Sequence, residues 1–467
     1  MKMWSGRVSQ PLNANFERWQ RSFRFDWRLL PYECVASRAH ARALAAAGIL
    51  SSGELDQIVN ALQALEGRVA PGAAPGEPSD AEDVHHFVEQ QLVAMIGEGG
   101  YKLHTGRSRN EQVATDLRLF TRDAIDELRA QLFALAGALC DRAEQLGETA
   151  MPSYTHLQRA EPILAAHWLL AYPQMFLRDA GRLAECRKRV NVLPLGSGAV
   201  AGCSFPLDRR AMARELGFDA ISANSMDAVS DRDFEIEFLN ALALVAVHLS
   251  RMAEDFVLYC SVEFGFVLLP DAFATGSSAM PQKKNPDAME LLRGKAGHIA
   301  GAASAVLLTV KGLPLTYNRD LQETQEPLFA AADATRDALR IAADFLRAVE
   351  FDCDRMHQAA ASGFLNATAA ANYLVRKGMP FRRAHEVVGR MVRKCLEQGC
   401  TLESLSAAER REFSELLGED FPAALELGCV LAEHNVAGGT APRQVKAALA
   451  EVRASLQQLQ EASFAHA

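Results

Sequence analysis

Apolar residues recur at helical spacing along most of this chain. Between residues 84 and 96 they fall three or four positions apart, which predicts an amphipathic helix, and Ser79–Glu82 before it has the form of a capping box. Alternating strand patterns are nearly absent. The pattern therefore predicts an all-α fold built around a bundle of long helices. Three longer stretches carry most of this signal, namely Glu111–Leu146, Phe234–Val262 and Leu291–Val310.

Segments rich in helix breakers indicate how the chain divides. Residues 68–78 are rich in Pro, Gly and Ala, which is typical of a linker or surface loop. Beyond Phe351 the expected helices shorten and glycine and proline return, which indicates a smaller terminal domain. We therefore expect three helical domains: an N-terminal domain over residues 1–106, a central long-helix bundle over 107–357 and a small C-terminal domain over 358–467.

Composition and charge narrow the class of protein. Of the 467 residues, 49% are apolar and 23% are charged, as in ordinary soluble globular proteins. The formal net charge of -9 argues against a nucleic-acid partner. The most apolar run, Phe234–Phe266, is interrupted by several charged residues, so we expect a buried helix and no membrane partner. Residues 1–7 are not followed by the apolar core of a signal peptide.

Cysteines and histidines do not form a metal-binding or disulfide pattern. The nine cysteines are scattered singly, and the closest pair, Cys395 and Cys400, is not a CxxC motif. The twelve histidines show no ligand spacing, and the adjacent His85 and His86 would point to different faces of a helix. We expect reduced thiols in the cytoplasm, with neither a metal nor another cofactor.

The stretch Gly276–Pro286, GSSAMPQKKNP, is the strongest chemical signal in the chain. It joins a flexible Gly-Ser-Ser to two lysines and an asparagine, and Pro286 is favoured at the start of the helix expected after it. A mobile hydroxyl pair, fixed cations and a helix N-terminus could grip and deprotonate a carboxylated substrate. Taken alone, the same composition also describes a surface loop with solvated lysines.

Four further polar segments lie beside the long helices. Lys102–Gln112 offers two arginines that suit a carboxylate, or it forms an exposed basic turn. Ser153–Arg159 places His156 between two prolines, where it could act as an acid or base, although a lone histidine is more often structural. Asn224–Asp233 by itself favours helix capping, and Thr316–Glu323 adds further polar groups. Each segment is a weak signal alone.

Together and in this order, the segments resemble one known family. GSSAMPQKKNP is similar to the signature of the fumarase/aspartase superfamily. KLHTGRSRNEQ, YTHLQRA, NSMDAVSDRDF and TYNRDLQE resemble argininosuccinate lyase, the relative of δ-crystallin. The resemblance runs from MWSGR near the start to about Pro327, and a weaker helical remainder follows.

The resemblance implies a reaction and catalytic roles. The family cleaves argininosuccinate into arginine and fumarate by β-elimination, in arginine biosynthesis. Ser277 would be the general base, and Lys283 and Asn285 would hold the carboxylate that takes up the charge. His156 would assist the departing guanidinium and pair with Glu290. The division of acid and base roles between the serine and the histidine comes from the family alone.

The resemblance also implies substrate contacts and an oligomer. The family's active sites draw on three subunits of a homotetramer, so the long bundle would assemble into a tetrameric core. The expected contacts at the fumarate side or the substrate backbone are Ser108, Arg109, Asn110 and Thr155. Those at the arginine side are Ser22, Tyr317 and Gln322.

Three positions or runs depart from the family's pattern. Residues 322–326 read QETQE where the family has QEDKE, so Thr324 and Gln325 replace an acid and a lysine. The missing cation would weaken binding of the arginine α-carboxylate by about 1–3 kcal/mol unless another group compensates. Ser5 replaces a usual glycine, and Glu161 a usual glutamine. The departures bear on the substrate more than on the elimination.

Three other functions compete with this reading. The closest is a related lyase that releases fumarate from another N-substituted aspartate, motivated by Thr324 and Gln325. Adenylosuccinate lyase fits less well, because Tyr317 and Gln322 would then match by coincidence. An inactive structural protein of the same fold, as some δ-crystallins are, has no reason to keep all five catalytic residues.

Overall fold

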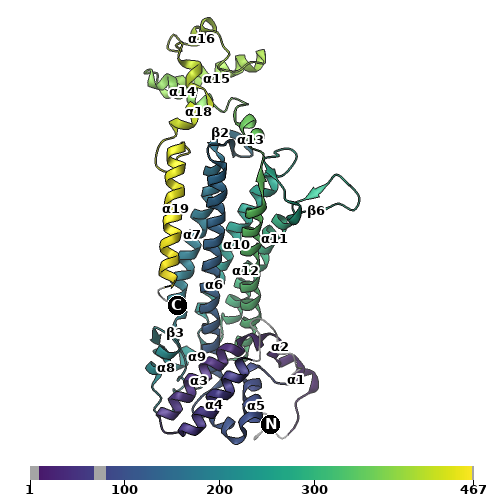
Figure 1. Ribbon diagram of the computed structural model, residues 1–467, viewed down its shortest axis with the longest axis vertical. Helices are drawn as coiled ribbons and strands as arrows, with labels where there is room; N and C mark the ends of the chain where they lie inside the picture. The colour runs from purple at the N-terminus through teal and green to yellow at the C-terminus, as the bar shows by residue number, and fades with distance from the viewer. Residues whose placement is uncertain (1–9, 68–79, 465–467) are drawn as a thin grey trace. The chain divides into compact units, whose positions relative to one another are not determined.

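The computed structural model describes residues 10–67 and 80–464 of the chain. Long helices dominate these residues (Figure 1), and the strands are short and paired two by two. The all-α fold class is therefore confirmed. The longest helices are α6 (Arg109–Leu146), α7 (Ala165–Val190), α10 (Asp233–Tyr259), α11 (Asp287–Val310), α12 (Gln325–Ala348) and α19 (Pro442–Phe464).

The helical runs expected from the sequence are confirmed by α6, α10 and α11, and the segment 84–96 forms α5 (Val84–Ile96). The predicted cap of α5 is wrong. Asp83, and not the predicted box, is the N-cap, and its Oδ1 accepts a hydrogen bond from the N–H of His86 at 2.8 Å. Asp83 directly precedes the first turn, so its carboxylate reaches a free N–H group there. Ser79, Ser5 and the expected linker 68–78 lie outside the described residues.

Shorter elements connect the long helices. In the part of the chain that the structure describes, four two-stranded sheets are formed by β1 (Ala150–Thr155) with β2 (Gln158–Leu164), β3 (Val192–Leu193) with β4 (Ala220–Ile221), β5 (Val267–Leu268) with β8 (Glu350–Phe351), and β6 (Thr275–Gly276) with β7 (Lys284–Asn285). All are antiparallel except the β3–β4 pair. The short helices before residue 330 are α1 (Ala14–Gln20), α2 (Phe23–Asp26), η1 (Trp27–Leu29), α3 (Leu30–Ala46), α4 (Ser52–Glu66), η2 (Gly97–His104), α8 (Arg209–Glu215), α9 (Ser225–Ser230), η3 (Asp271–Phe273) and η4 (Arg319–Thr324).

The chain groups into two compact units. The first comprises Met1–Arg129, Gly181–Leu244 and Gly297–Thr335, and the second comprises Ala130–Ala180, Val245–Ala296 and Arg336–Ala467. The boundaries fall inside α6, α7, α10, α11 and α12, so each of these helices contributes a segment to both units. The three domain boundaries expected from the sequence stay a prediction.

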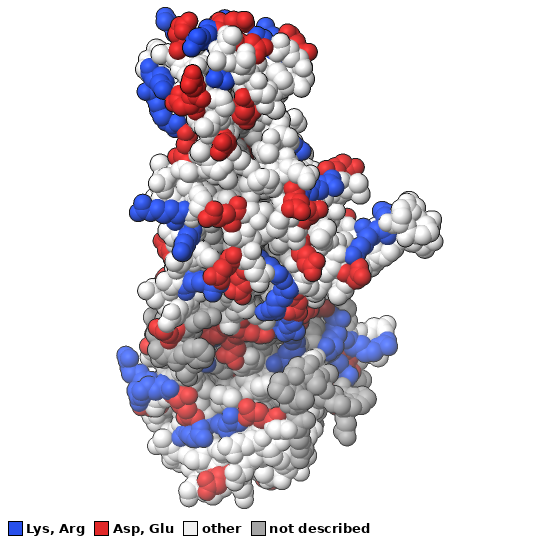
Figure 2. Space-filling view, turned by 45° about the horizontal axis from the view of Figure 1, so that its top comes forward, with Lys and Arg blue, Asp and Glu red and all other residues white. Residues whose placement is uncertain are grey.

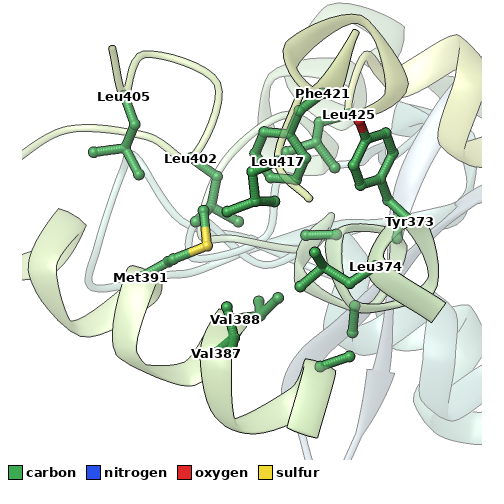
Figure 3. Close-up of a cluster of buried hydrophobic side chains, with 14 of the residues drawn as sticks. Tyr373, Leu374, Val387, Val388, Met391, Leu402, Leu405, Leu417, Phe421 and Leu425 are labelled. Carbon is green, nitrogen blue, oxygen red and sulfur yellow. The ribbon is translucent and has the colours of Figure 1, made fainter. Parts of the chain in front are cut away.

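The C-terminal segment builds an apolar core of its own (Figure 3). Leu374, Met391 and Phe421 are fully buried there, among helices as short as the sequence indicates. The long helix α19 was not expected, although Val445 and Val452 are buried at helical spacing along it. The short helices of the segment are α13 (Cys353–Ala360), α14 (Ala367–Arg376), α15 (Phe381–Gln398), α16 (Ala407–Phe413), α17 (Phe421–Ala424) and α18 (Leu427–Glu433).

Helix α10 contains the apolar run singled out in the sequence. Among the described residues it is the one helix long and apolar enough to cross a membrane, and half of its most apolar window is buried within the fold. Core helices share these properties. On the face shown in Figure 2, blue and red side chains are interspersed over the described residues, and no broad blue area covers it.

Candidate active site

A cavity of about 240 Å³ lies in the first compact unit. Segments 22–26, 82–86, 109–113 and 317–325 line it, although they are far apart in sequence. Gln325, at the position where the sequence departs from the family's lysine, also lines the cavity. The structure thus gathers most of the expected substrate contacts in one place, namely Ser22, Arg109, Asn110, Tyr317 and Gln322.

Asp26 is a buried acid in the cavity wall, and its hydrogen-bond donors among the described residues are neutral. Its carboxylate accepts from the hydroxyl of Ser22 at 2.6 Å and from the N–H of Val84 at 3.0 Å. Burial, and to a lesser degree the neighbouring charge of Asp83, raise the pKa of Asp26 to about 8. Asp26 therefore holds the Ser22 side chain in place, and a cationic ligand would favour its ionised form.

The other charged groups of the cavity are paired. Arg109 forms an ion pair with Asp83, the N-cap of α5, and Arg319 pairs with Glu82 at 2.9 Å. Burial raises the pKa of Asp83, but Arg109, His85 and the N–H of His86 together outweigh this effect, and the pKa lies below its ordinary value. The α5 cap thus fixes the guanidinium of Arg109 at the cavity.

The segment 317–325 forms the remaining wall. Gln322 donates from Nε2 to the carbonyl of Gln20 at 3.1 Å, and burial raises the pKa of the Tyr317 hydroxyl. Gln325 is buried, and its Oε1 has no hydrogen-bond partner among the described residues. An unpaired buried acceptor in a cavity wall favours a ligand that donates a hydrogen bond there.

We expect the Asp26→Asn substitution to change how stability depends on pH. The folded protein keeps the Asp26 proton up to about pH 8, whereas the ordinary pKa is 3.8, so wild-type stability falls as pH rises through this range. Asparagine does not titrate, so the variant does not lose this stability as pH rises. Relative to wild type, the variant should gain at least about 1 kcal/mol between pH 5 and pH 8.5, measured by chemical denaturation. Parallel pH profiles for the two proteins would show that Asp26 is ionised when the protein is folded.

His156 lies at the tip of the β1–β2 hairpin, in the second unit. Thr155 pairs with Gln158, so His156 and Leu157 form a two-residue turn, and both have φ of 56°. Such turns require positive φ, which residues other than glycine rarely adopt. Thr155 and His156 are exposed. The hairpin therefore presents the histidine to its surroundings on a short, defined turn.

The GSSAMPQKKNP segment is a second hairpin, which projects from the helices beside it (Figure 1). Strands β6 and β7 pair Thr275 with Asn285, so residues 277–283 form the connecting loop. Within it, Ser277 Oγ accepts hydrogen bonds from the N–H groups of Ala279 and Met280 at 3.2 and 3.1 Å. The Lys284 ammonium contacts Asp271 at 2.5 Å. The serine oxygen thus lies against two backbone donors.

Lys283 and Glu290 complete the expected catalytic set. The ammonium of Lys283 is exposed and has no ion pair with a described residue. Glu290 lies in the first turn of α11, 3.7 Å from the guanidinium of Arg293. The pairing of Glu290 with His156 stays a prediction.

The expected residues therefore fall into two groups. Ser108 belongs to the first unit with the cavity residues, and its Oγ accepts from the N–H of Asn110 at 3.2 Å. The others lie on the two hairpins or on the start of α11, all within the second unit: Thr155, His156, Ser277, Lys283, Asn285 and Glu290.

Two features beside the cavity were not predicted. Glu111 is fully buried in the first turn of α6, and its carboxylate binds backbone N–H groups of the loop Gly196–Cys203. This loop contacts Asn110 through the carbonyl of Ala199. The glycine-rich string GSGAVAGC was the available sequence signal. No sequence signal marked the role of the Glu111 carboxylate, because its partners lie about 85 residues further along the chain.

A buried cluster of Glu33, His85 and Asp116 has the residue types of a metal site. However, donors occupy the Glu33 carboxylate: Nδ1 of His85 lies 2.8 Å from Oε2, and Oε1 accepts from Ser37 and Gln112. Burial and the charge of Glu33 raise the pKa of Asp116 well above its usual range. Protein groups thus already occupy the Glu33 carboxylate, and its contact with His85 supports the cavity wall there.

Comparison with known proteins places the chain in a family. A family model described as Lyase matches residues 6–301, and one described as Argininosuccinate lyase C-terminal matches residues 364–432. The crystal structure of EDDS lyase in complex with formate has a TM-score of 0.84 at 28% identity, covering 94% of this chain and 88% of that one.

Two curated proteins resemble the chain over nearly all of its length. The argininosuccinate lyase of Koribacter versatilis is 57% identical over 456 residues, which covers 98% of both chains. The argininosuccinate lyase of Acidobacterium capsulatum is 58% identical over 454 residues, which covers 96% of this chain and 93% of that protein. On this similarity, the chain belongs to the argininosuccinate lyase family.

Proposed function

We propose that this protein cleaves argininosuccinate into arginine and fumarate by β-elimination of a C–N bond, as a step of arginine biosynthesis. The observation that carries the proposal is the cavity of the first unit. Arg109 and Asn110, expected at the fumarate side or the substrate backbone, share it with Tyr317 and Gln322, expected at the arginine side. One cavity thus contains groups suited to both halves of this substrate.

The electrostatics of the cavity suit the arginine half. That half carries an ammonium group, and Asp26 is an acid of the wall whose hydrogen-bond partners are both neutral. An ammonium bound beside it would restore the ionised carboxylate and form a charge-assisted hydrogen bond. The guanidinium of Arg109, held by Asp83, offers a planar donor to a substrate carboxylate.

The elimination requires stabilisation of a growing negative charge. A proton leaves the carbon next to a carboxylate, the electrons move into that carboxylate, and the C–N bond then breaks. Preorganised donors at such a carboxylate contribute about 3 kcal/mol each. Lys283 and Asn285 would supply them, together with the N-terminus of α11, which begins at Asp287.

Ser277 would remove the proton. A serine hydroxyl is a weak base, but the N–H groups of Ala279 and Met280 already point at its oxygen and favour a negative charge there. His156 would assist the departing guanidinium, with Glu290 orienting it. The two hairpins would close over the substrate to bring these groups into position.

We further propose that the enzyme is a cytoplasmic homotetramer whose active sites combine several subunits. Along α11, Leu291 and Leu308 are 66% and 68% exposed, and no described residue lies within 4 Å of where a Cβ at Gly294 or Gly301 would be. An exposed face of leucines and glycines on a long helix suits close packing against a helix of another subunit. Hairpins of one subunit could then reach the cavity of another.

The direct test is to incubate the purified protein with argininosuccinate and follow fumarate by its absorbance. We expect fumarate and arginine to form in equal amounts. No fumarate at high enzyme concentration would refute the proposal, and a mass below that of a tetramer would refute the proposed assembly.

A second candidate is a related lyase that releases fumarate from another N-substituted aspartate. Gln325 favours it, because the unpaired Oε1 accepts a hydrogen bond where a lysine would attract a carboxylate. The similarity to EDDS lyase shows that this fold carries other lyases as well. Comparing fumarate release from argininosuccinate with that from an analogue lacking the arginine α-carboxylate separates the two candidates. Faster release from the analogue would favour the second.

The Gln325→Lys substitution tests whether the arginine α-carboxylate binds near residue 325 by changing the protein and not the substrate. If the arginine α-carboxylate binds near residue 325, a lysine there should lower the KM for argininosuccinate about tenfold through a charge-assisted hydrogen bond. The value of kcat should change little, because this group is remote from the reacting carbon. Gln325→Met, of similar length and without charge, is the control. An unchanged KM in the lysine variant would show that another group binds the carboxylate.

A further inference from the structure

Glu111 is a buried carboxylate that binds two separate backbone segments. It is fully buried, and its Oε1 accepts from the N–H of Ser108 at 3.0 Å. Its Oε2 accepts from the N–H groups of Gly196 and Gly198 at 2.6 and 3.0 Å. Both oxygens are therefore engaged, and together they connect the start of α6 to the loop Gly196–Cys203.

The loop Gly196–Cys203 has one narrow backbone path. Gly196 and Gly198 have φ of +91° and +60°. A Cβ at Gly198 would lie 2.9 Å from the carbonyl oxygen of Gly202, and one at Gly196 would lie 2.6 Å from the Arg209 side chain. Within the loop, the N–H of Gly202 bonds to the carbonyl of Ser197 at 2.9 Å. The loop therefore adopts this path only with glycine at these positions.

The tip of this loop contacts a cavity residue. The Nδ2 of Asn110 donates to the carbonyl of Ala199 at 3.3 Å, and Asn110 lines the cavity. An amide has a distinct donor end and acceptor end. Because the Ala199 carbonyl accepts only from the nitrogen end, this contact fixes which end of Asn110 faces the substrate.

We propose that Glu111 is a positioning residue for the elimination: its carboxylate holds Gly196–Gly198 so that the carbonyl of Ala199 orients the Asn110 amide in the cavity. This inference rests on the proposed function, because the orientation of Asn110 matters only if substrate binds there. It assigns Glu111 an effect on the reaction without substrate contact.

The carboxylate is required because every group it meets is a donor. Glutamine at position 111 keeps one acceptor oxygen and turns an N–H₂ group toward either Ser108 or the loop, where it faces another N–H. Thr115→Val is the matched control: Thr115 is fully buried one turn further along α6, and its hydroxyl bonds to the carbonyl of Glu111. That change weakens the helix without touching the loop.

The experiment measures kcat/KM for argininosuccinate in Glu111→Gln, Asn110→Ala and the double variant. We expect Glu111→Gln to lose about 10- to 100-fold, as small misplacements in active sites do. The double variant should be no worse than Asn110→Ala alone, because Glu111 acts through Asn110. Thr115→Val should stay within about threefold of wild type. Losses that multiply in the double variant would overturn the proposal.

Two further measurements keep the test decisive. Gly198→Ala distorts the same loop from its other side, so it should show the same non-additivity with Asn110→Ala if Glu111→Gln does not fold. Hydrogen exchange should speed up at residues 196–203 in Glu111→Gln, but not in Thr115→Val. Unchanged hydrogen exchange at these residues would show that Glu111 does not hold the loop. If wild type releases no fumarate, the proposed function fails, while the exchange result still decides whether Glu111 holds the loop.

Discussion

Replacing Ser277 with alanine should lower kcat for argininosuccinate about 1000-fold or more and change KM by less than about threefold. Alanine removes the oxygen that accepts the substrate proton and leaves the fold intact, because among the described residues the hydroxyl bonds to two N–H groups of its own loop. Those N–H groups would turn to solvent. The loss should therefore fall on the chemical step, and steady-state kinetics with native mass measurement would show it.

Ser278→Ala is the matched control for this prediction. The two serines are adjacent in the same loop, and the Ser278 side chain is exposed. We expect the Ser278 variant to stay within about threefold of wild type, because its hydroxyl has no assigned role in the elimination. A Ser277→Ala enzyme that keeps a tenth of the wild-type kcat would show that another group removes the proton.

Lys283→Met should lower kcat about 100- to 1000-fold, because it removes one preorganised cation from the carboxylate that takes up the charge. Methionine keeps most of the length and the apolar stem of lysine. The fold should tolerate the change, since the Lys283 ammonium has no ion pair with a described residue. The measurement is kcat at saturating argininosuccinate.

The next residue supplies the control for Lys283. Lys284 reaches back to Asp271 and to the carbonyl of Leu269, so its charge serves the base of the hairpin. Lys284→Met should make the hairpin less ordered and reduce kcat less than tenfold. If the Lys284 variant loses more activity than the Lys283 variant, the roles assigned to the two lysines are wrong.

Helices α6, α10 and α11 could be predicted because their sequences contain few breakers and repeat apolar positions over many turns, whereas α7 and α12 were not expected. Helix α19 was missed, although Val445 and Val452 mark its buried face. The segment before it contains many glycines and prolines, which predict short helices and loops. The cap of α5 was predicted at the wrong residue, because the sequence cannot show that Asp83 also pairs with Arg109.

The sequence predicts site residues only where residues that act together are also neighbours in the chain. Ser277, Lys283 and Asn285 share one hairpin, and Arg109 and Asn110 share the first turn of α6. The roles of Asp26 and Glu111 could not be predicted in this way, because they depend on burial and on partners that are distant in the sequence. The resemblance, and not the spacing of the residues, supplied the roles of Tyr317 and Gln322.

We propose that one part of the site depends on assembly. The cavity belongs to the first unit, while His156 and the Ser277 loop belong to the second. If three subunits build each active site, as the family resemblance implies, residues of different chains complete one site. No pattern within a single sequence specifies such contacts.

The most direct test of the central claim is a crystal structure of the Ser277→Ala enzyme with argininosuccinate bound. We predict intact substrate in the cavity, with its succinate part against Arg109 and Asn110 and its arginine part against Tyr317 and Gln322. The Cβ of residue 277, from a neighbouring subunit, should lie next to the carbon that loses its proton, with Lys283 and Asn285 at the adjacent carboxylate. Substrate bound away from this cavity, or a closed loop that leaves residue 277 remote from that carbon, would contradict the account.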